Sequence, residues 1–154
     1  MQDALSWEIE EVGETLKVTL KGDVTESIDF APLLERPEKN MVFDLEGIRQ
    51  FTSPGVRLWV HFINDLTKDR RVVLERCSVA VVQQLYMIAN MRGDAKIRSI
   101  MLPYFCASCE ADETKLLDLE SGTPEIKTEL PCEKCEGEME FDDLPESYLS
   151  FHND

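Results

Sequence analysis

The first hundred residues carry apolar side chains whose spacing changes repeatedly between the period of a strand and that of a helix. Leu16, Val18 and Leu20 alternate with polar residues, which is typical of a half-buried strand. The predicted elements are strands at residues 5–9, 16–20, 41–45, 71–74 and 97–101, and helices at residues 30–34, 54–67 and 78–89, the last with Val82, Leu85, Ile88 and Ala89 on one side. Residues 11–14 are predicted to form a hairpin turn between the first two strands. The resulting order of strands and helices predicts an α/β fold in which helices cover a sheet.

Acidic residues are concentrated in the last third of the chain. Residues 1–102 contain 16 acidic and 13 basic residues, a net charge of −3, whereas residues 103–154 contain 15 acidic and 3 basic residues, a net charge of −12. This change predicts a first domain of residues 1–102 and an acidic module of residues 103–154. Such a surface repels phosphate groups, so we expect no nucleic-acid partner.

Four of the five cysteines form two pairs in the acidic module. Cys106 and Cys109 are separated by two residues, as are Cys132 and Cys135, and 22 residues lie between the pairs. Two residues between thiolates let one tight turn aim both sulfurs at a single point, and two such turns supply the tetrahedral ligand set that Zn²⁺ prefers. The pattern predicts a structural zinc ion bound by these four residues. The ion would stabilise a small β module that is too poor in apolar residues to build a core by itself.

Three other interpretations of the cysteine pairs fit the sequence less well. Disulfides favour secreted proteins, iron–sulfur clusters favour tighter spacings, and a thioredoxin-like motif needs one pair rather than two. Residues 114–119 and 125–130, between the pairs, are predicted to form a hairpin around a turn at residues 121–124. Cys77 lies outside the set and is expected to be a small buried side chain.

The junction at residues 52–55 (Thr-Ser-Pro-Gly) opens the longest predicted helix. Because proline is favoured at the first helical position, Pro54 predicts that Ser53 is the N-cap. A phosphate on Ser53 would lie at the positive end of the helix dipole, and Gly55 would allow a partner to approach closely. The same residues also fit a capped helix with no further role.

Residues 18–102 resemble the STAS domain, the fold of bacterial anti-sigma factor antagonists. The resemblance rests on MVFDLEGI at residues 41–48, on TSPG at residues 52–55, and on the strand at residues 71–74 followed by CSVAVVQQL at residues 77–85. It implies a mixed sheet covered by helices. Such domains usually close with another helix, whereas this chain continues into the cysteine pairs.

In the family, a strand of this kind leads to Asp-Ser-x-Gly, and the serine is phosphorylated by a partner kinase. The serine corresponds to Ser53 and the glycine to Gly55, whereas Thr52 replaces the aspartate and is a second candidate acceptor. The resemblance implies that Thr52, Ser53, Pro54 and Gly55 form the partner-binding surface. The partner would be a serine kinase or an anti-sigma-like protein, and phosphorylation would switch its docking.

No catalytic motif is recognisable in the sequence. It lacks HExxH, Walker A, GxGxxG and GxSxG patterns, and His61 and His152 are its two histidines. We therefore expect a non-enzymatic regulatory protein-interaction module. The alternative is a constitutive scaffold or assembly subunit whose zinc module provides the contact surface.

The expected location is the cytoplasm. No apolar run approaches the roughly 20 residues that span a bilayer, so we expect no membrane association. The N-terminus has no basic residue followed by an apolar core, as a secretory signal would. The sequence leaves open a homo-oligomer.

Overall fold

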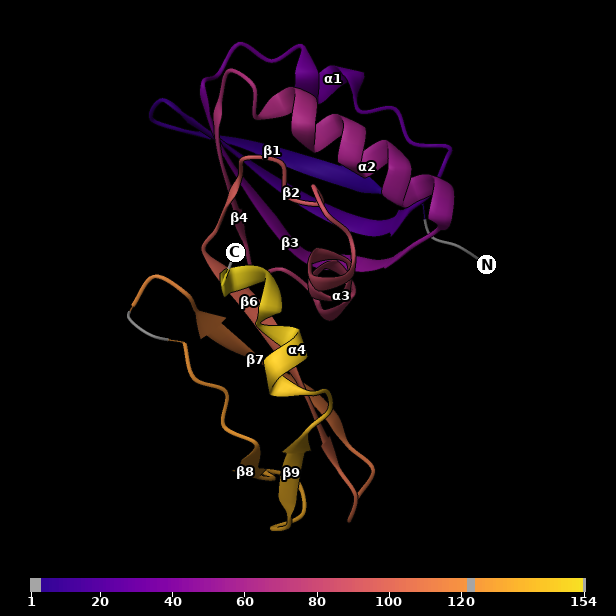
Figure 1. Cartoon of the computed structure of the whole chain (residues 1–154), viewed down its shortest axis with the longest axis vertical. Coiled ribbons are helices and arrows are strands. Elements are labelled where there is room, and N and C mark those ends of the chain that lie inside the picture. Colours follow the sequence, from indigo (N-terminus) through magenta and orange to yellow (C-terminus); the bar gives the residue numbers. More distant parts are fainter. Residues whose placement is uncertain (1–3, 122–123, 154) are drawn as a thin grey trace.

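The computed structural model describes residues 4–121 and 124–153, in which two sheets lie one after the other along the chain (Figure 1). The first part contains β1 (Ser6–Val12), β2 (Thr15–Val24), α1 (Ala31–Leu34), β3 (Asn40–Phe51), α2 (Ser53–Leu66), β4 (Arg71–Glu75), α3 (Val79–Met87) and β5 (Lys96–Ile97). The second contains β6 (Ser99–Cys106), β7 (Asp112–Asp118), β8 (Glu129–Pro131), β9 (Glu138–Phe141), α4 (Pro145–Tyr148) and a final 3-10 turn, η1 (Ser150–Asn153).

The first sheet has the strand order β1-β2-β3-β4-β5 and is mixed. β1 and β2 form an antiparallel hairpin that turns at Gly13, and the other neighbours are parallel. Gly13 has a φ of 62°, a left-handed conformation that glycine adopts without strain. The predicted α/β class is confirmed, as is the order of elements from β1 to α3. The strand predicted at residues 97–101 is divided between β5 and β6, which belong to different sheets.

One face of this sheet is apolar and carries the helices. Leu16, Val18 and Leu20 on β2 are fully buried, because alternate residues of a strand point to the same face. Phe30, before α1, stacks on Phe62 of α2 with ring centroids 4.2 Å apart. Burial of each such side chain contributes about 1.5–3 kcal/mol. The opposite face is charged and includes a salt bridge of 3.7 Å between Lys17 and Glu75.

The second sheet is antiparallel, with the order β7-β6-β9-β8. β6 runs without interruption through the boundary expected between residues 102 and 103. The hairpin predicted between residues 114–119 and 125–130 is wrong: β7 pairs with β6, and β8 pairs with β9. Each cysteine pair lies in the turn between two consecutive strands, and these two strands pair with each other across that turn. Of the turn expected at residues 121–124, residues 122 and 123 lie outside the described part.

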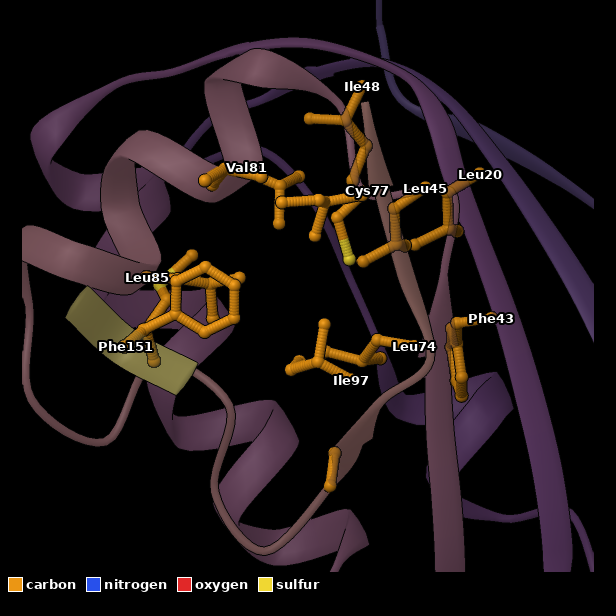
Figure 2. Packing of buried hydrophobic residues seen from close by; sticks show 14 of the residues in the cluster. Leu20, Phe43, Leu45, Ile48, Leu74, Cys77, Val81, Leu85, Ile97 and Phe151 are labelled. Atoms are coloured by element: carbon orange, nitrogen blue, oxygen red, sulfur yellow. The ribbon is translucent and has the colours of Figure 1, made fainter. Parts of the chain in front are cut away.

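The two sheets share one hydrophobic core at α3. Tyr148 and Phe151, at the end of the chain, are buried together with Leu85 of α3. Figure 2 shows Phe151 beside Leu85, and Cys77 and Leu45 pointing into the same interior. Cys77 is fully buried, as expected, and its backbone joins the sheets, because its N–H donates to the Ser99 carbonyl at 3.1 Å.

The predicted helix over residues 78–89 ends earlier than expected. Ser78 is its N-cap, as predicted, and accepts a hydrogen bond from the Val81 amide. α3 ends at Met87, and Ile88 and Ala89 are exposed, so their assignment to its buried side is wrong. None of the helices in the described ranges has the length and apolar character that a membrane crossing requires.

Candidate functional site

The four paired cysteines lie in two turns at the end of the second sheet. The first cysteine turn, residues 106–109, leads from β6 towards β7, and the second, residues 132–135, leads from β8 towards β9. β6 and β9 pair directly, with Cys106 opposite Met139. This pairing holds the two turns side by side and brings together ligands that are more than 20 residues apart in sequence.

The four sulfur atoms form one compact cluster, as the sequence predicted. They all lie within 4.8 Å of one another. Two separations cross between the turns: 3.4 Å from Cys106 Sγ to Cys135 Sγ and 3.8 Å from Cys109 Sγ to Cys132 Sγ. Four sulfurs at about 2.3 Å from one ion in tetrahedral geometry are about 3.8 Å apart. The cluster therefore has the size and donor chemistry to hold a metal ion.

The backbone has the same form in both cysteine turns. The N–H of Cys106 donates to the carbonyl of Ala111 at 2.9 Å, and the N–H of Cys132 donates to that of Gly137 at 2.8 Å, in each case five residues later. The residues that follow the turns, Glu110 and Glu136, have φ values of 60° and 64°. A left-handed conformation costs a non-glycine residue about 1–2 kcal/mol. Its occurrence at equivalent positions indicates that closing the turns around the sulfurs requires it.

Backbone amides stabilise negative charge on the Cys106 sulfur. The amide of Cys109 donates to this sulfur and, with the thiol of Cys135, lowers the pKa of Cys106 to about 7. For Cys135, the amide of Gly137 acts in the same direction, but hydrogen bonds with the thiols of Cys106 and Cys109 outweigh it and raise the pKa to about 12. The cluster thus accepts one negative charge readily. Full ionisation of the other thiols needs a cation to offset the repulsion.

Exposure differs among the four cysteines. Cys106 and Cys132 are buried, Cys135 is half-buried and Cys109 is exposed. All four are free thiols, as is Cys77. The cluster therefore lies at the protein surface, and an ion can reach it from the side of Cys109.

At the start of α2, the structure corrects the predicted helix cap. Thr52, not Ser53, is the N-cap: its backbone is extended and its hydroxyl accepts a hydrogen bond from the Gly55 amide at 3.0 Å. The Thr52 amide donates to the Val24 carbonyl at 3.0 Å, which ties the cap to the end of β2. Because this anchor fixes Thr52 in the extended conformation, the helix begins at Ser53 and Pro54 is its second residue.

The other residues of this segment differ in their access to solvent. Ser53 and Pro54 are exposed, whereas Gly55 is buried. A Cβ atom on Gly55 would lie 2.0 Å from the Val24 carbonyl oxygen. The close approach expected at Gly55 is therefore made by the chain itself, and a molecule that docks here meets Ser53 and Pro54.

Glu26 is a neighbour of this segment that sequence reasoning missed. The Thr52 hydroxyl lies 3.3 Å from Glu26 Oε2 and can donate to it. A carboxylate thus lies beside the threonine that caps α2. No local pattern reveals this contact, because the two residues are 26 positions apart.

Sequence reasoning also missed the strand that supports the second cysteine turn. Residues 138–143 include four acidic residues, and Glu138 and Glu140 are exposed. Met139 and Phe141, which alternate with them, are buried on β9. This alternation is the signal that could have identified the strand.

Neither histidine belongs to the four-cysteine cluster or to residues 52–55. His61 is exposed on α2, and His152 is half-buried in η1.

A scan against protein-family models and a search of curated proteins found no match to this chain.

Proposed function

We propose that this chain is a non-enzymatic regulatory protein-interaction module: a STAS-like domain fused to a zinc-stabilised β module. The STAS-like assignment is supported by the mixed sheet and by the placement of the motif. Thr52 links β3 to α2, residues 53–55 form the first turn of α2, and the matching residues 71–74 and 77–85 lie on β4 and at α3. The anti-sigma factor antagonists that this arrangement resembles act by binding protein partners.

The metal in this proposal is Zn²⁺ with a structural role. Four thiolates in two matching turns favour zinc, and a closed set of four protein ligands leaves no position for a catalytic water. Cys106, Cys109, Cys132 and Cys135 would bind the ion and fix the turns on which β8 and β9 depend. β8 has only three residues and β9 four, so these strands need that constraint.

The observation that carries the regulatory proposal is the exposed hydroxyl of Ser53 on the first turn of α2. Within the described residues this hydroxyl has no hydrogen-bond partner, whereas the Thr52 hydroxyl is occupied by the cap and by Glu26. Ser53 is therefore the favoured acceptor and Thr52 the second. A phosphate on Ser53 would add a charge of about −1.5 to −2 at the start of α2 and block a partner by charge and bulk.

The test uses a panel of anti-sigma-type serine kinases and the whole chain. We expect phosphate to map to Ser53, to disappear in Ser53→Ala and to persist in Thr52→Ser, which keeps the cap. Ser53→Asp should weaken binding of the unphosphorylated chain to the kinase about tenfold, with Ser53→Asn as the uncharged control. Undiminished labelling of a double variant, Ser53→Ala with Thr52→Ala, would remove the switch.

A constitutive scaffold is the second candidate function, and the surface position of the cysteine turns favours it. Cys109, Glu110, Glu133 and Glu136 are exposed around the sulfur cluster, so the turns can contact another protein. In that case partner capture should survive Ser53→Asp and be lost after substitution of Glu133 and Glu136 by lysine. The serine-switch proposal expects the reverse. Both proposals exclude nucleic acid as the partner, because residues 103–154 carry a net charge of −12.

A further inference from the structure

Apolar side chains are exposed where α3 ends. The exposed fractions are 59% for Met87, 37% for Ile88 and 68% for Leu144. They make up half of the six large hydrophobic residues that are exposed in the described part of the chain; the others are Ile9, Val12 and Leu116. A concentration of this kind marks an interaction surface more often than single exposed residues do.

Contacts between α3 and the end of the chain bring these residues to one region. The Tyr86 hydroxyl donates to Asp143 Oδ2 at 3.2 Å, and the Tyr86 and Tyr148 rings lie 6.2 Å apart. Met87 follows Tyr86 and Leu144 follows Asp143, so the hydrogen bond holds the two apolar residues on neighbouring segments. Tyr148 is fully buried, which makes this support rigid.

A hollow lies on the same surface. It has a volume of about 250 Å³ and is lined by residues 85–92 and Phe151. Leu85 and Phe151, which are among its lining residues, lie side by side (Figure 2). This volume is below that of a typical small-molecule site and suits a single apolar side chain. Met87, Ile88 and Leu144, together with this hollow, are called the α3 surface below.

The charge around the α3 surface selects the occupant. Asp142 and Glu146 flank Leu144 in sequence and are exposed. Residues 142–152 contain three acidic residues, Asp142, Asp143 and Glu146, and no lysine or arginine, whereas Arg92 lines the hollow. A second copy of the chain would bring another net charge of −15 to this acidic rim, which disfavours self-association. A basic partner gains attraction to the rim as well as burial of apolar area.

We propose that the α3 surface docks a basic amphipathic segment of another protein. One apolar side chain of that segment would enter the hollow, its neighbours would cover Met87 and Leu144, and its lysines or arginines would face Asp142 and Glu146. Helix-in-groove recognition uses this combination of apolar anchors and flanking charge. The proposal is independent of Ser53, which lies at the start of a different helix.

The test measures binding of a labelled model peptide of leucine and lysine at helical spacing to the full chain by fluorescence anisotropy. Met87→Gln with Leu144→Gln should weaken binding about tenfold, because apolar anchors dominate such interfaces. Leu116→Gln, which removes an exposed leucine on β7, is the matched control and should change affinity less than about twofold. Asp142→Lys with Glu146→Lys should also weaken binding and reduce its dependence on salt.

Three results would overturn the proposal. Equal weakening by Leu116→Gln, or none by the double glutamine variant, would place the peptide elsewhere. Equally tight binding of a control peptide with serine in place of leucine would reduce the effect to charge. A dimer that the double glutamine variant dissociates, measured by light scattering, would make a second copy the occupant. Circular dichroism of each variant checks that the exposed substitutions leave the fold intact.

Discussion

The hydroxyl of Tyr148 donates a hydrogen bond to the carbonyl oxygen of Met101 at 2.5 Å, across a separation of 47 residues. Met101 lies on β6, which starts the second sheet, and Tyr148 ends α4 near the end of the chain. The Tyr148 ring also contacts Phe141 on β9, with centroids 5.3 Å apart. The chain end thus fastens the second sheet to α3, and the acidic module shares a core with the first domain.

Removal of this hydrogen bond should destabilise the whole chain. Tyr148→Phe keeps the ring but leaves the buried Met101 carbonyl without this donor, so we expect the free energy of unfolding to fall by about 1–2 kcal/mol. Tyr86→Phe, which removes a more exposed hydroxyl, should cost less than about 0.5 kcal/mol. Urea unfolding followed by fluorescence measures both variants. Equal losses of unfolding free energy in the two variants would mean that the buried Tyr148 hydrogen bond stabilises the chain no more than the Tyr86 hydrogen bond does.

Metal removal should unfold the second sheet before the first. We expect about one zinc ion per chain by elemental analysis, since a structural site binds one ion with four ligands. Cys132→Ser should lose the metal and Cys77→Ser should retain it. After chelation, amide signals of β8, β9 and the cysteine turns should collapse while those of β2 and β3 persist. Identical spectra with and without chelator would show that the ion does not support the fold.

Zinc affinity should rise with pH, most steeply below neutrality. Thiols must lose their protons to bind the ion, so protons compete with it. Because the pKa of Cys106 is lowered to about 7, this thiol holds its proton below pH 7 and is ionised above it. Zinc binding should therefore release more protons at pH 6 than at pH 8. Calorimetry in buffers of different ionisation enthalpy counts them, and a constant number across this range would contradict the assignment.

Gly55→Ala should be destabilising although alanine is the better helix former. The gain in helix propensity is at most about 1 kcal/mol. The new Cβ would lie 2.0 Å from the Val24 carbonyl oxygen, a backbone atom that cannot rotate away. The expected net loss is about 1–3 kcal/mol in thermal or urea unfolding. Ser53→Ala, two residues earlier and exposed, is the control, and its free energy of unfolding should stay within about 0.5 kcal/mol of wild type. An unchanged or raised stability of Gly55→Ala would show that α2 can shift away from β2.

The local patterns were sufficient for the order of elements from β1 to α3 and for the four clustered cysteines. Alternating Leu16, Val18 and Leu20 identify β2, because a strand with one buried face must repeat every two residues. The spacing of Cys106 and Cys109 identifies half of the sulfur cluster, because a tight turn of this length lets two sulfurs converge. Both signals lie within a few residues, so the sequence alone carries them.

Other features depend on partners that no local pattern names. The sequence of residues 112–118 does not indicate that β7 pairs with β6. Pro54 favours Ser53 as the N-cap, whereas the hydrogen bond from the Thr52 amide to Val24 makes Thr52 the cap. Ile88 has the right spacing for the buried side of α3 and is exposed because the helix ends before it.

The sequence by itself determined the alternation of strands and helices in the first part and the convergence of the two sulfurs within each cysteine pair in the second, since both follow from short-range geometry. Tertiary structure alone decided that β6 continues across the compositional boundary, that Tyr148 closes the second sheet onto α3, and that Gly55 serves the contact with Val24. The physical reason is that each of these depends on backbone or side-chain contacts between residues tens of positions apart, where packing selects one partner among many that the sequence allows.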